Sequence, residues 1–402
     1  MGDSQQQFRR LAILTTVHRW GDPRVFERNA SAALEWGLEV HAFMPFSGKL
    51  ELPPWAQTDH FHLHPLPLPT GRFRRMRLSL FAYRYVLEQG EFDVVHFHAS
   101  ELIPAMIWLR LLRPKTKILY DVHEELPLEI LSKPYIPKPF KPIAIFFSRL
   151  LWWLAARCFH AFAPATEPIA LYWPKQRTRV VHNYPKQTFD IKVPDESPNP
   201  NRIVFVGGLA GIRGIAELLV AVKRLRSEFL FLRVELYGRI MDQDLTATIA
   251  SAVDEGWCLH TVWLSQSELA QKLIGAGIGV APYHPVPSFI EALPTKLFEY
   301  MALGIPALVS DFPLWRKIVE DAEAGIAVAP TRAGLEEGLR FMISNSAKLE
   351  EWSRNGRRVY TQKYRWEMES ANLLALYEKL GLDVPSQSSL KLPIPSPEMQ
   401  VS

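Results

Sequence analysis

Two glutamates, Glu291 and Glu299, lie eight positions apart at the entry to a short helical segment. Pro294 and Thr295 are typical of a helix start, and Gly304 is a stop signal before an apolar run. The sequence therefore predicts Glu291 in a loop and Glu299 on a helix. Free amides at a helix start attract a diphosphate, and carboxylates beside them can accept hydrogen bonds from sugar and ribose hydroxyls. The bare pair would also fit a surface helix with two solvated acids.

The surrounding segment, EALPTKLFEYMALGIPALVS from Glu291 to Ser310, resembles the E-x7-E signature of glycosyltransferase family 4 in its P-x-K-x-x-E-Y-M-A-x-G-x-P variant. Weaker resemblance extends over nearly the whole chain. The family comprises retaining enzymes of the GT-B fold. The resemblance implies that Glu291 contacts the donor sugar and that Glu299 binds the nucleotide ribose. Thr295 and Lys296, at the helix start, are then expected to bind the donor diphosphate.

Another segment, the glycine-rich GGLAGIRG from Gly207 to Gly214, follows an apolar strand and precedes a helical run. A glycine turn lets backbone amides approach phosphates, and Arg213 can pair with their charge. The segment resembles the family's G-R-L-x-x-x-K-G element, with Gly208 in place of the usual Arg and Arg213 in place of the Lys. Lys296 or Arg239 would compensate for the missing cation. The alternative is a structural tight turn with a surface arginine.

His123 follows the strand-like run KILYDV and would lie at the carboxyl end of that strand. The segment resembles the family's T-x-H-D element, whose histidine contacts the donor sugar, although a lone histidine here also fits a structural role. His96 and His98 share one face of another strand and mimic a metal pair. We expect no metal there because the sequence offers no third ligand nearby.

The segment GDPRVFER follows the first strand, where family members carry a loop that touches acceptor and phosphate. Asp22 and Arg24 are therefore candidates for those contacts. Asp22 also fits the N-cap of a helix that begins at Pro23, and both roles can hold at once.

Length and pattern indicate two doubly wound α/β domains, because short apolar runs alternate with amphipathic segments along all 402 residues. Strands are expected at 11–15, 39–43, 94–97, 117–121, 159–163 and 179–182, and again at 203–206, 232–237, 261–264, 278–281, 307–309 and 326–328. Helices are expected at 23–36 and 102–112, among others. We assign an N-terminal acceptor-side domain to 1–185, a linker to 186–202, a nucleotide-sugar-binding domain to 203–364, a helix crossing back to the first domain to 365–382, and a disordered tail to 383–402. Ligands of such sheets bind at strand carboxyl ends, so the two domains are expected to face each other across a cleft.

Composition indicates the cellular compartment and the classes of partner to expect. The two cysteines, Cys158 and Cys258, lack metal-ligand or disulfide-framework spacing, which favours a reducing compartment. The first residues lack the layout of a signal peptide, so we expect the cytoplasm. Residues 1–190 hold 24 basic and 17 acidic side chains, against 22 and 25 in the remainder. No RRM or KH signature accompanies this charge, which argues against nucleic acid as a partner.

Two segments concentrate the basic charge: the cluster Arg72, Arg74, Arg75 and Arg77, and the aromatic run from Lys138 to Arg157. The run is interrupted by Arg149, so it should not cross a bilayer. It could lie on an anionic membrane face, with the arginine cluster adding attraction to headgroups. A helix packed in the domain core and a solvated loop explain the same residues equally well.

Together with these patterns, the resemblance implies a retaining glycosyltransferase that uses a UDP- or GDP-linked sugar and a saccharide or lipid-linked acceptor, and we expect no cofactor and no metal. Polysaccharide or glycolipid synthesis at the inner face of the cell membrane would fit. One alternative is an epimerase or an inverting transferase of the same architecture. Another is a non-catalytic protein that binds sugar nucleotides or acts as a membrane scaffold, which the missing arginine at position 208 keeps open.

Overall fold

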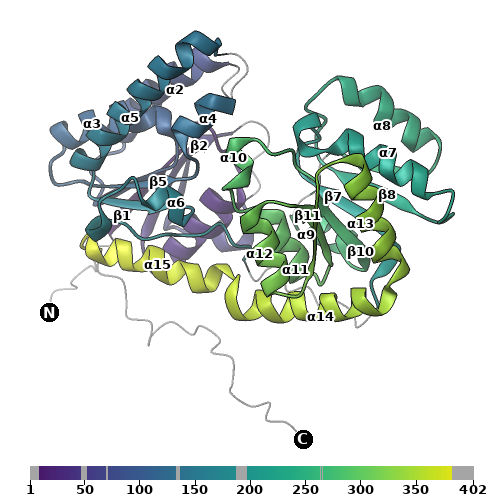
Figure 1. Cartoon of the computed structure of the whole chain (residues 1–402). Helices are drawn as coiled ribbons and strands as arrows, with labels where there is room; N and C mark the ends of the chain where they lie inside the picture. The colour runs from purple at the N-terminus through teal and green to yellow at the C-terminus, as the bar shows by residue number, and fades with distance from the viewer. Residues whose placement is uncertain are drawn as a thin grey trace, which may run out of the picture. The chain divides into compact units, whose positions relative to one another are not determined.

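A computed structural model describes residues 9–46, 52–68, 71–132, 136–186, 197–262, 264 and 266–382. The chain divides into two compact units (Figure 1). Unit 1 comprises Met1–His123, Phe146–Val181 and Ser370–Ser402, and unit 2 comprises Glu124–Ile145 and His182–Glu369. Unit 2 thus includes 124–145, which the sequence placed in the first domain. Within it, α4 (Leu126–Ser132) packs against α10 (Pro287–Ile290). The predicted disordered tail lies outside the described residues.

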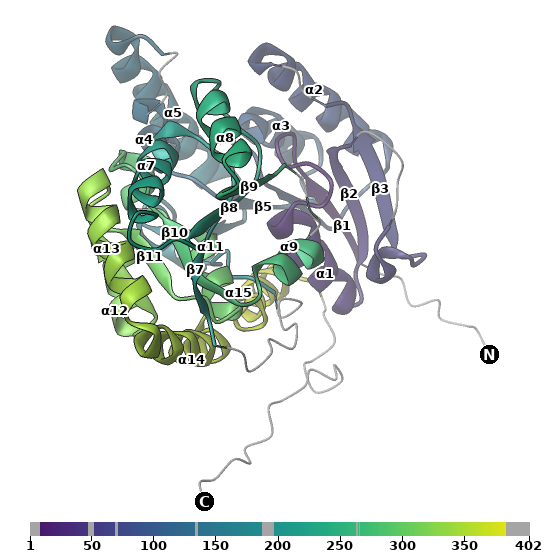
Figure 2. The same ribbon diagram turned by 90° about the vertical axis from the view of Figure 1, so that its right-hand side faces the viewer.

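Unit 1 is built on a sheet of six parallel strands in the order β3-β2-β1-β4-β5-β6. The strands are β1 (Arg10–Leu14), β2 (Glu39–Pro45), β3 (Phe61–Leu66), β4 (Val94–Phe97), β5 (Lys117–Val122) and β6 (Ala161–Pro164). In both views α2 (Arg72–Glu88), α3 (Ile103–Leu112) and α5 (Lys141–Cys158) lie on the side of the sheet away from α15 (Trp366–Lys379) (Figures 1 and 2). The π-helix η1 (Pro23–Ala30) and α1 (Ser31–Glu35) connect β1 to β2, and Trp36 at the end of α1 packs on Tyr377 of α15.

Unit 2 repeats this plan with six parallel strands in the order β12-β11-β10-β7-β8-β9. They are β7 (Asn199–Val206), β8 (Arg233–Tyr237), β9 (Cys258–Thr261), β10 (Ala276–Ala281), β11 (Ala307–Ser310) and β12 (Gly325–Val328). Its principal helices are α7 (Ile215–Leu225), α8 (Asp244–Asp254), α9 (Gln266–Leu273), α11 (Thr295–Ala302), α12 (Pro313–Asp321), α13 (Arg332–Ser344) and α14 (Ser346–Lys363). The strands of both sheets are mostly buried, which explains why they appear in the sequence as apolar runs rather than alternating patterns.

The structure corrects several local predictions. The segment 179–182 is not a strand of the described sheet, although the neighbouring Thr178 forms an isolated bridge with Phe162 of β6. The strand β3 was missed, and β9 begins and ends three residues before the predicted segment. The strand β7 begins at Asn199, inside the predicted linker. The arginine cluster opens the helix α2, so the interpretation of the cluster as a loop was wrong.

The last described helix, α15, joins the two units through the chain. Its first residues, Trp366–Glu369, belong to unit 2, whereas the residues from Ser370 onward belong to unit 1. Glu369 accepts hydrogen bonds from the backbone amide of His182, at 2.9 Å, and from its ring nitrogen Nδ1, at 3.0 Å. Within unit 1, the hydroxyl of Tyr377 lies 2.8 Å from Nδ1 of His96. The predicted return of the C-terminal helix to the first domain is confirmed.

Candidate functional site

The helix α11 carries the second glutamate of the signature. Leu297, Phe298 and the three residues Tyr300–Ala302 are buried, while Lys296 and Glu299 are half-buried. Lys296 and Glu299 are three residues apart and therefore share one face of the helix. Glu291 is exposed and follows α10, in the loop before α11. The loop and helix positions of the two glutamates are thus as predicted.

The buried side of α11 is held on the sheet by Tyr300. A side chain at Gly279 of β10 would come within 2.5 Å of the Tyr300 ring, so the glycine makes room for it. The Tyr300 hydroxyl reaches the carbonyl oxygens of Val280, at 3.3 Å, and Val204, at 3.4 Å. The Tyr-Met-Ala part of the signature therefore anchors the helix that presents Lys296 and Glu299.

The glycine turn after β7 forms the second part of this site. Gly207 has φ 123°, a backbone conformation that favours glycine. A Cβ built on Gly207 would lie 3.2 Å from Nη1 of Arg213 and 3.5 Å from Nζ of Lys296. The same Nη1 donates a hydrogen bond of 3.1 Å to the carbonyl oxygen of Gly208. Two cations from separate elements therefore meet at one glycine.

Tyr283, which the sequence did not single out, lies next to both of these cations. Its hydroxyl accepts a hydrogen bond of 2.6 Å from Nζ of Lys296. The Arg213 guanidinium lies 5.5 Å from the centre of its ring. Tyr283 is buried two residues after β10, so it is a rigid support for both charges. A positively charged glycine turn of this kind suits a diphosphate.

The remaining donor-side candidates lie around the same strand ends. The hydroxyl of Thr295, the first residue of α11, accepts a hydrogen bond of 3.2 Å from the side-chain amide of Asn183. Arg239 follows β8, its side chain is exposed, and its carbonyl oxygen accepts from the amide of Leu209 at 2.7 Å. The backbone of Arg239 therefore braces the glycine turn, whatever its side chain binds.

A different constellation surrounds His123 in unit 1. The carboxylate of Asp121, at the end of β5, is 1% exposed and accepts two hydrogen bonds from Arg24, at 2.6 and 3.1 Å. His98 Nδ1 lies 3.1 Å from Asp121 Oδ2 and 3.2 Å from His123 Nε2. His123 is largely buried and also lies 3.5 Å from Asp121 Oδ1. Asp121 and His98 together fix the position of the His123 ring.

The π-helix η1 explains how Arg24 reaches this carboxylate. Its hydrogen bonds span five residues, which brings Arg24 and Asn29 onto one face. Asn29 donates a third hydrogen bond to Asp121, at 3.1 Å. Asp22 caps the helix by accepting from the amides of Arg24 and Val25, both at 2.9 Å, so the predicted N-cap is confirmed. Arg24 is 3% exposed and engages Asp121, so it supports the site from inside rather than offering its charge to solvent.

Burial and charge set the protonation of this cluster. Burial lowers the pKa of His123 to about 4, and the nearby Arg24 acts in the same direction. Burial also holds the pKa of His98 well below its usual value. For Asp121 burial works in the opposite direction, but the Arg24 charge and the histidine hydrogen bonds hold its pKa well below the usual range. His123 is therefore a neutral imidazole beside an ionised carboxylate at neutral pH.

Two groups in the described chain have metal-ligand chemistry. The first is His96, His98 and Asp121, which supplies the third ligand that the sequence appeared to lack, because β4 and β5 are neighbours in the sheet. Arg24 already holds that carboxylate with its own positive charge. The expected lack of a third ligand was thus wrong, but the charge of Arg24 leaves these residues a poor fit for a divalent cation.

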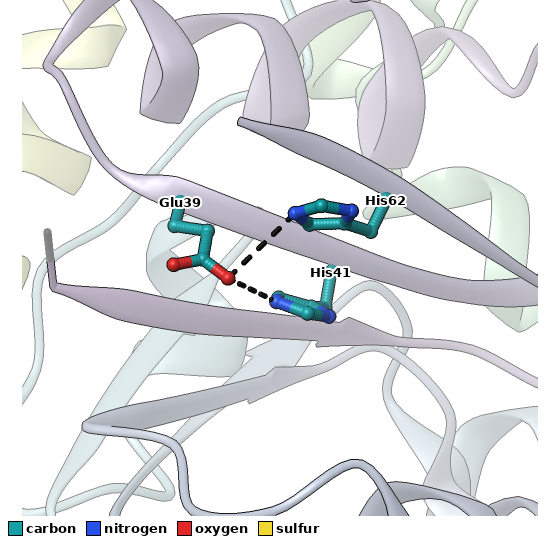
Figure 3. Close-up of side chains that lie close together, drawn as sticks. All are labelled: Glu39, His41 and His62. Carbon is teal, nitrogen blue, oxygen red and sulfur yellow. Dashed lines mark hydrogen bonds and ion pairs between the residues drawn. The ribbon is translucent and has the colours of Figure 1, made fainter. Parts of the chain in front are cut away.

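The second group is Glu39, His41 and His62 on β2 and β3 (Figure 3). Glu39 Oε1 lies 2.7 Å from His41 Nε2 and 3.6 Å from His62 Nε2. Arg10 approaches the same atoms, with Nε 3.3 Å from Glu39 and Nη2 3.1 Å from His41. A guanidinium again supplies the positive charge, so neither group fits a metal in the arrangement shown.

Two family models match successive parts of the chain. The model described as "Glycosyltransferase Family 4" matches residues 13–183, and the model described as "Glycosyl transferases group 1" matches residues 186–359. A phosphatidyl-myo-inositol mannosyltransferase from Mycolicibacterium smegmatis is 24% identical over 363 residues, which is 86% of each chain. An MMP alpha-(1->4)-mannosyltransferase from Mycolicibacterium hassiacum is 27% identical over 190 residues, or 46% of this chain, and the match spans 45% of that relative's length.

Solved structures show the same fold at low sequence identity. Sucrose-phosphate synthase from Thermosynechococcus elongatus superposes with a TM-score of 0.70 at 15% identity, covering 93% of this chain and 99% of that one. WaaG, a glycosyltransferase involved in lipopolysaccharide biosynthesis, gives a TM-score of 0.65 at 15% identity, with 92% and 100% covered. The paired six-stranded parallel sheets are thus the GT-B architecture. The chain is a GT-B enzyme that depends on nucleoside diphosphate sugars and belongs to glycosyltransferase family 4.

Proposed function

We propose that this enzyme transfers a sugar from a UDP- or GDP-linked donor to the hydroxyl of a saccharide or lipid-linked acceptor, with retention of configuration at the anomeric carbon. The observation that carries the proposal is the meeting of Arg213 and Lys296 at Gly207. Departure of the sugar leaves negative charge on the diphosphate. Fixed cations at that position stabilise the transition state more than the ground state.

The proposed chemistry breaks the bond between the anomeric carbon and the donor phosphate oxygen and forms a bond from that carbon to the acceptor oxygen. The departing phosphate accepts the proton of the acceptor hydroxyl, so no enzyme base is required. Arg213, Lys296 and the free amides at the start of α11 receive the diphosphate. Because these groups supply positive charge, we propose that the reaction needs no metal and no other cofactor.

Three further residues are assigned to the sugar and the nucleoside. Glu299 accepts hydrogen bonds from the ribose hydroxyls, and Glu291 binds hydroxyls of the donor sugar. His123 contacts the sugar as a neutral imidazole, in keeping with its lowered pKa of about 4. Asp121 and His98 are positioning residues that act through His123.

The relatives suggest which substrates to test first. Two of them are named as mannosyltransferases, so GDP- and UDP-linked mannose and glucose are the first donors for a panel. One of them is named for phosphatidyl-myo-inositol, which together with the basic first half of this chain favours a lipid-linked acceptor. We propose that the product serves cell-surface polysaccharide or glycolipid synthesis in the cytoplasm.

A thermal-shift screen against these nucleotide sugars tests donor binding, because a specific ligand raises the melting temperature by mass action. Turnover is then measured with and without lipid and saccharide acceptors, and the anomeric configuration of the product is read by NMR. Acceptor-dependent release of nucleoside diphosphate with retained configuration supports the proposal. An inverted product, an epimerised donor or no turnover would each support one of the rival functions.

Two variants separate the roles of the glutamates. Glu299→Ala should weaken nucleotide binding roughly tenfold, since it removes a charged hydrogen-bond acceptor. Glu291→Ala should lower kcat by roughly a hundredfold with a smaller effect on nucleotide affinity. Glu320→Ala, at an exposed position of α12, is the control and should change neither. Small and equal effects of the two test variants would contradict the assignment.

A further inference from the structure

The helices α2 and α3, and the part of α5 from Phe146 onward, belong to unit 1 and leave large apolar side chains in solvent. On α5, the exposed side chains of Phe146, Phe147, Leu150, Trp153 and Leu154 recur at the spacing of one helical stripe. Phe146 is 63% exposed and Trp153 is 51% exposed. Singly scattered exposed apolar residues are common on soluble proteins, whereas a row of large ones on one helix is not. The opposite stripe of α5 is buried, as Ser148, Trp152 and Ala155 show. The helix is therefore apolar on both sides.

The neighbouring helices extend this exposed stripe into a face. On α3, Trp108 and Leu111 are 62% and 67% exposed, and α2 adds Met76 and Leu80. The helix α2 packs against α3, and the carboxyl-terminal ends of α3 and α5 line one surface pocket. All three helices cover the same side of the sheet (Figures 1 and 2). We call this outer surface of α2, α3 and α5 the aromatic face.

The charge on the aromatic face is almost entirely positive. Neither α3 nor α5 contains an aspartate or glutamate, and the only acid of α2 is Glu88, its last residue. Arg75, Arg77 and Arg149 are exposed among the apolar side chains. Arg157 lies 3.5 Å from the centre of the Trp153 ring, so the cation and the aromatic ring form one amphipathic unit.

We propose that the aromatic face binds the surface of an anionic lipid bilayer. Phenylalanine and tryptophan side chains enter the region between headgroups and acyl chains, and arginines beside them bind lipid phosphates. No described helix is long and apolar enough to span a membrane, and a face that lies flat needs no such helix. Pairing with a second copy is disfavoured because it would bring two arginine-rich faces together. The proposal concerns a surface of unit 1 and does not depend on the donor chemistry.

Vesicle sedimentation of the full chain tests the proposal without any donor or acceptor. The protein should bind vesicles of phosphatidylcholine with phosphatidylglycerol, bind phosphatidylcholine alone at least tenfold more weakly, and lose affinity as salt is raised. The double variant Phe146→Ser, Phe147→Ser should reduce binding at least tenfold. Arg149→Gln should reduce it roughly fivefold, the effect expected of one cation at an anionic surface.

The matched control is Phe231→Ser, because Phe231 is 82% exposed but lies in unit 2. This variant should bind vesicles like the unaltered chain. Wild-type binding by the double variant, or no binding of the unaltered chain to anionic vesicles, would overturn the proposal. Sedimentation equilibrium tests whether a second copy of the chain binds the aromatic face instead. A dimer that dissociates in the double variant would show that it does. Retained near-UV circular dichroism would show that the variants still fold.

Discussion

Lys296 Nζ donates a hydrogen bond of 2.6 Å to the Tyr283 hydroxyl, and this contact determines where the lysine charge lies. Lysine carries its charge on a flexible stem, so a cation that must meet a diphosphate gains from a fixed partner. Tyr283 is buried two residues after β10, and β10 lies next to β7, the strand that the glycine turn follows. The tyrosine therefore links the helix that bears Lys296 to the turn that bears Gly207.

Tyr283→Phe should weaken the binding of a nucleoside diphosphate by roughly three- to tenfold, the effect of one hydrogen bond, while preserving the fold. The ring remains, so its packing and its contact with Arg213 are kept. Isothermal titration calorimetry with UDP and GDP measures the change. Tyr237→Phe is the control, because its hydroxyl donates to Glu235, away from the two cations. Equal losses in both variants would mean that Tyr283 has no special role in binding the diphosphate.

Gly207→Ala should nearly abolish nucleotide binding. The added methyl group would lie 3.2 Å from Arg213 Nη1 and 3.5 Å from Lys296 Nζ, where the diphosphate is proposed to sit. The same calorimetric titration measures the loss. Gly256→Ala controls for backbone strain, since Gly256 also has a positive φ of 78° but has open space around it. Both variants should lose some stability, whereas only Gly207→Ala should lose nucleotide affinity.

Asp121→Asn should lower the free energy of unfolding by roughly 3–5 kcal/mol. The change leaves the buried Arg24 charge without its carboxylate, and an uncompensated buried cation is costly. Urea unfolding followed by circular dichroism measures the difference.

Removing the charge as well should reverse part of this loss. The double variant Arg24→Met, Asp121→Asn should be more stable than Asp121→Asn alone, because no buried cation remains. If the two variants unfold at the same urea concentration, the loss does not come from the Arg24 charge. Activity should stay low in both, because His123 loses the Asp121 carboxylate.

Acidification should lower the free energy of unfolding at pH values above those at which the carboxylates titrate, because of three histidines in unit 1. His64, His123 and His160 all have a pKa lowered to about 4, mainly by burial. Unfolded histidines bind protons near pH 6.5, so between that pH and about 4 the unfolded chain takes up protons that the folded chain does not. Stability is therefore highest above pH 6.5 and falls through this range, by on the order of 3 kcal/mol for His123 alone.

Urea unfolding at a series of pH values checks this sign. Asp121, whose pKa is lowered, adds stability that is present above the ordinary carboxylate pKa of about 4 and is lost as the pH falls from there toward its lowered pKa, so it steepens the decline at the acid end. A free energy of unfolding that is flat or rises between pH 6.5 and 4.5 would show that these histidines are not buried in the neutral form.

The sequence predicted most strands and the position of α11, because buried parallel strands and a helix bounded by Pro294 and Gly304 depend on local chemistry. It missed β3, whose sequence FHLHPL alternates histidine with apolar residues and contains Pro65. As an edge strand, β3 tolerates a proline that a central strand would not. The segment 179–182 has strand-like composition, and the amides of Arg179 and Val181 donate to the carbonyl oxygens of Phe162 and Pro164 of β6. This partial ladder is too irregular to make the segment a strand.

The site itself was only partly predictable. Arg213, Lys296 and the glutamates were predicted from their own sequence contexts. The meeting of Arg213 and Lys296 at Gly207, however, depends on the order of β7 and β10 in the sheet. Tyr283 was missed because a tyrosine after an apolar run is usually core. Asp121 and His98 come from adjacent strands, so only the register of β4 with β5 brings them together. Two signals in the sequence could have indicated this cluster: the spacing of His96 and His98 two residues apart, and Asp121 two residues before His123.

The division of α15 between the units has a consequence for synthesis on the ribosome. Unit 1 contains the first strands to be made, yet Tyr377, which reaches His96, lies in the part of α15 that follows Ser370. The early part of a nascent chain can collapse but cannot close over that histidine until the residues as far as Tyr377 have emerged. Premature termination near position 370 would therefore leave the amino-terminal half exposed to chaperones and proteases.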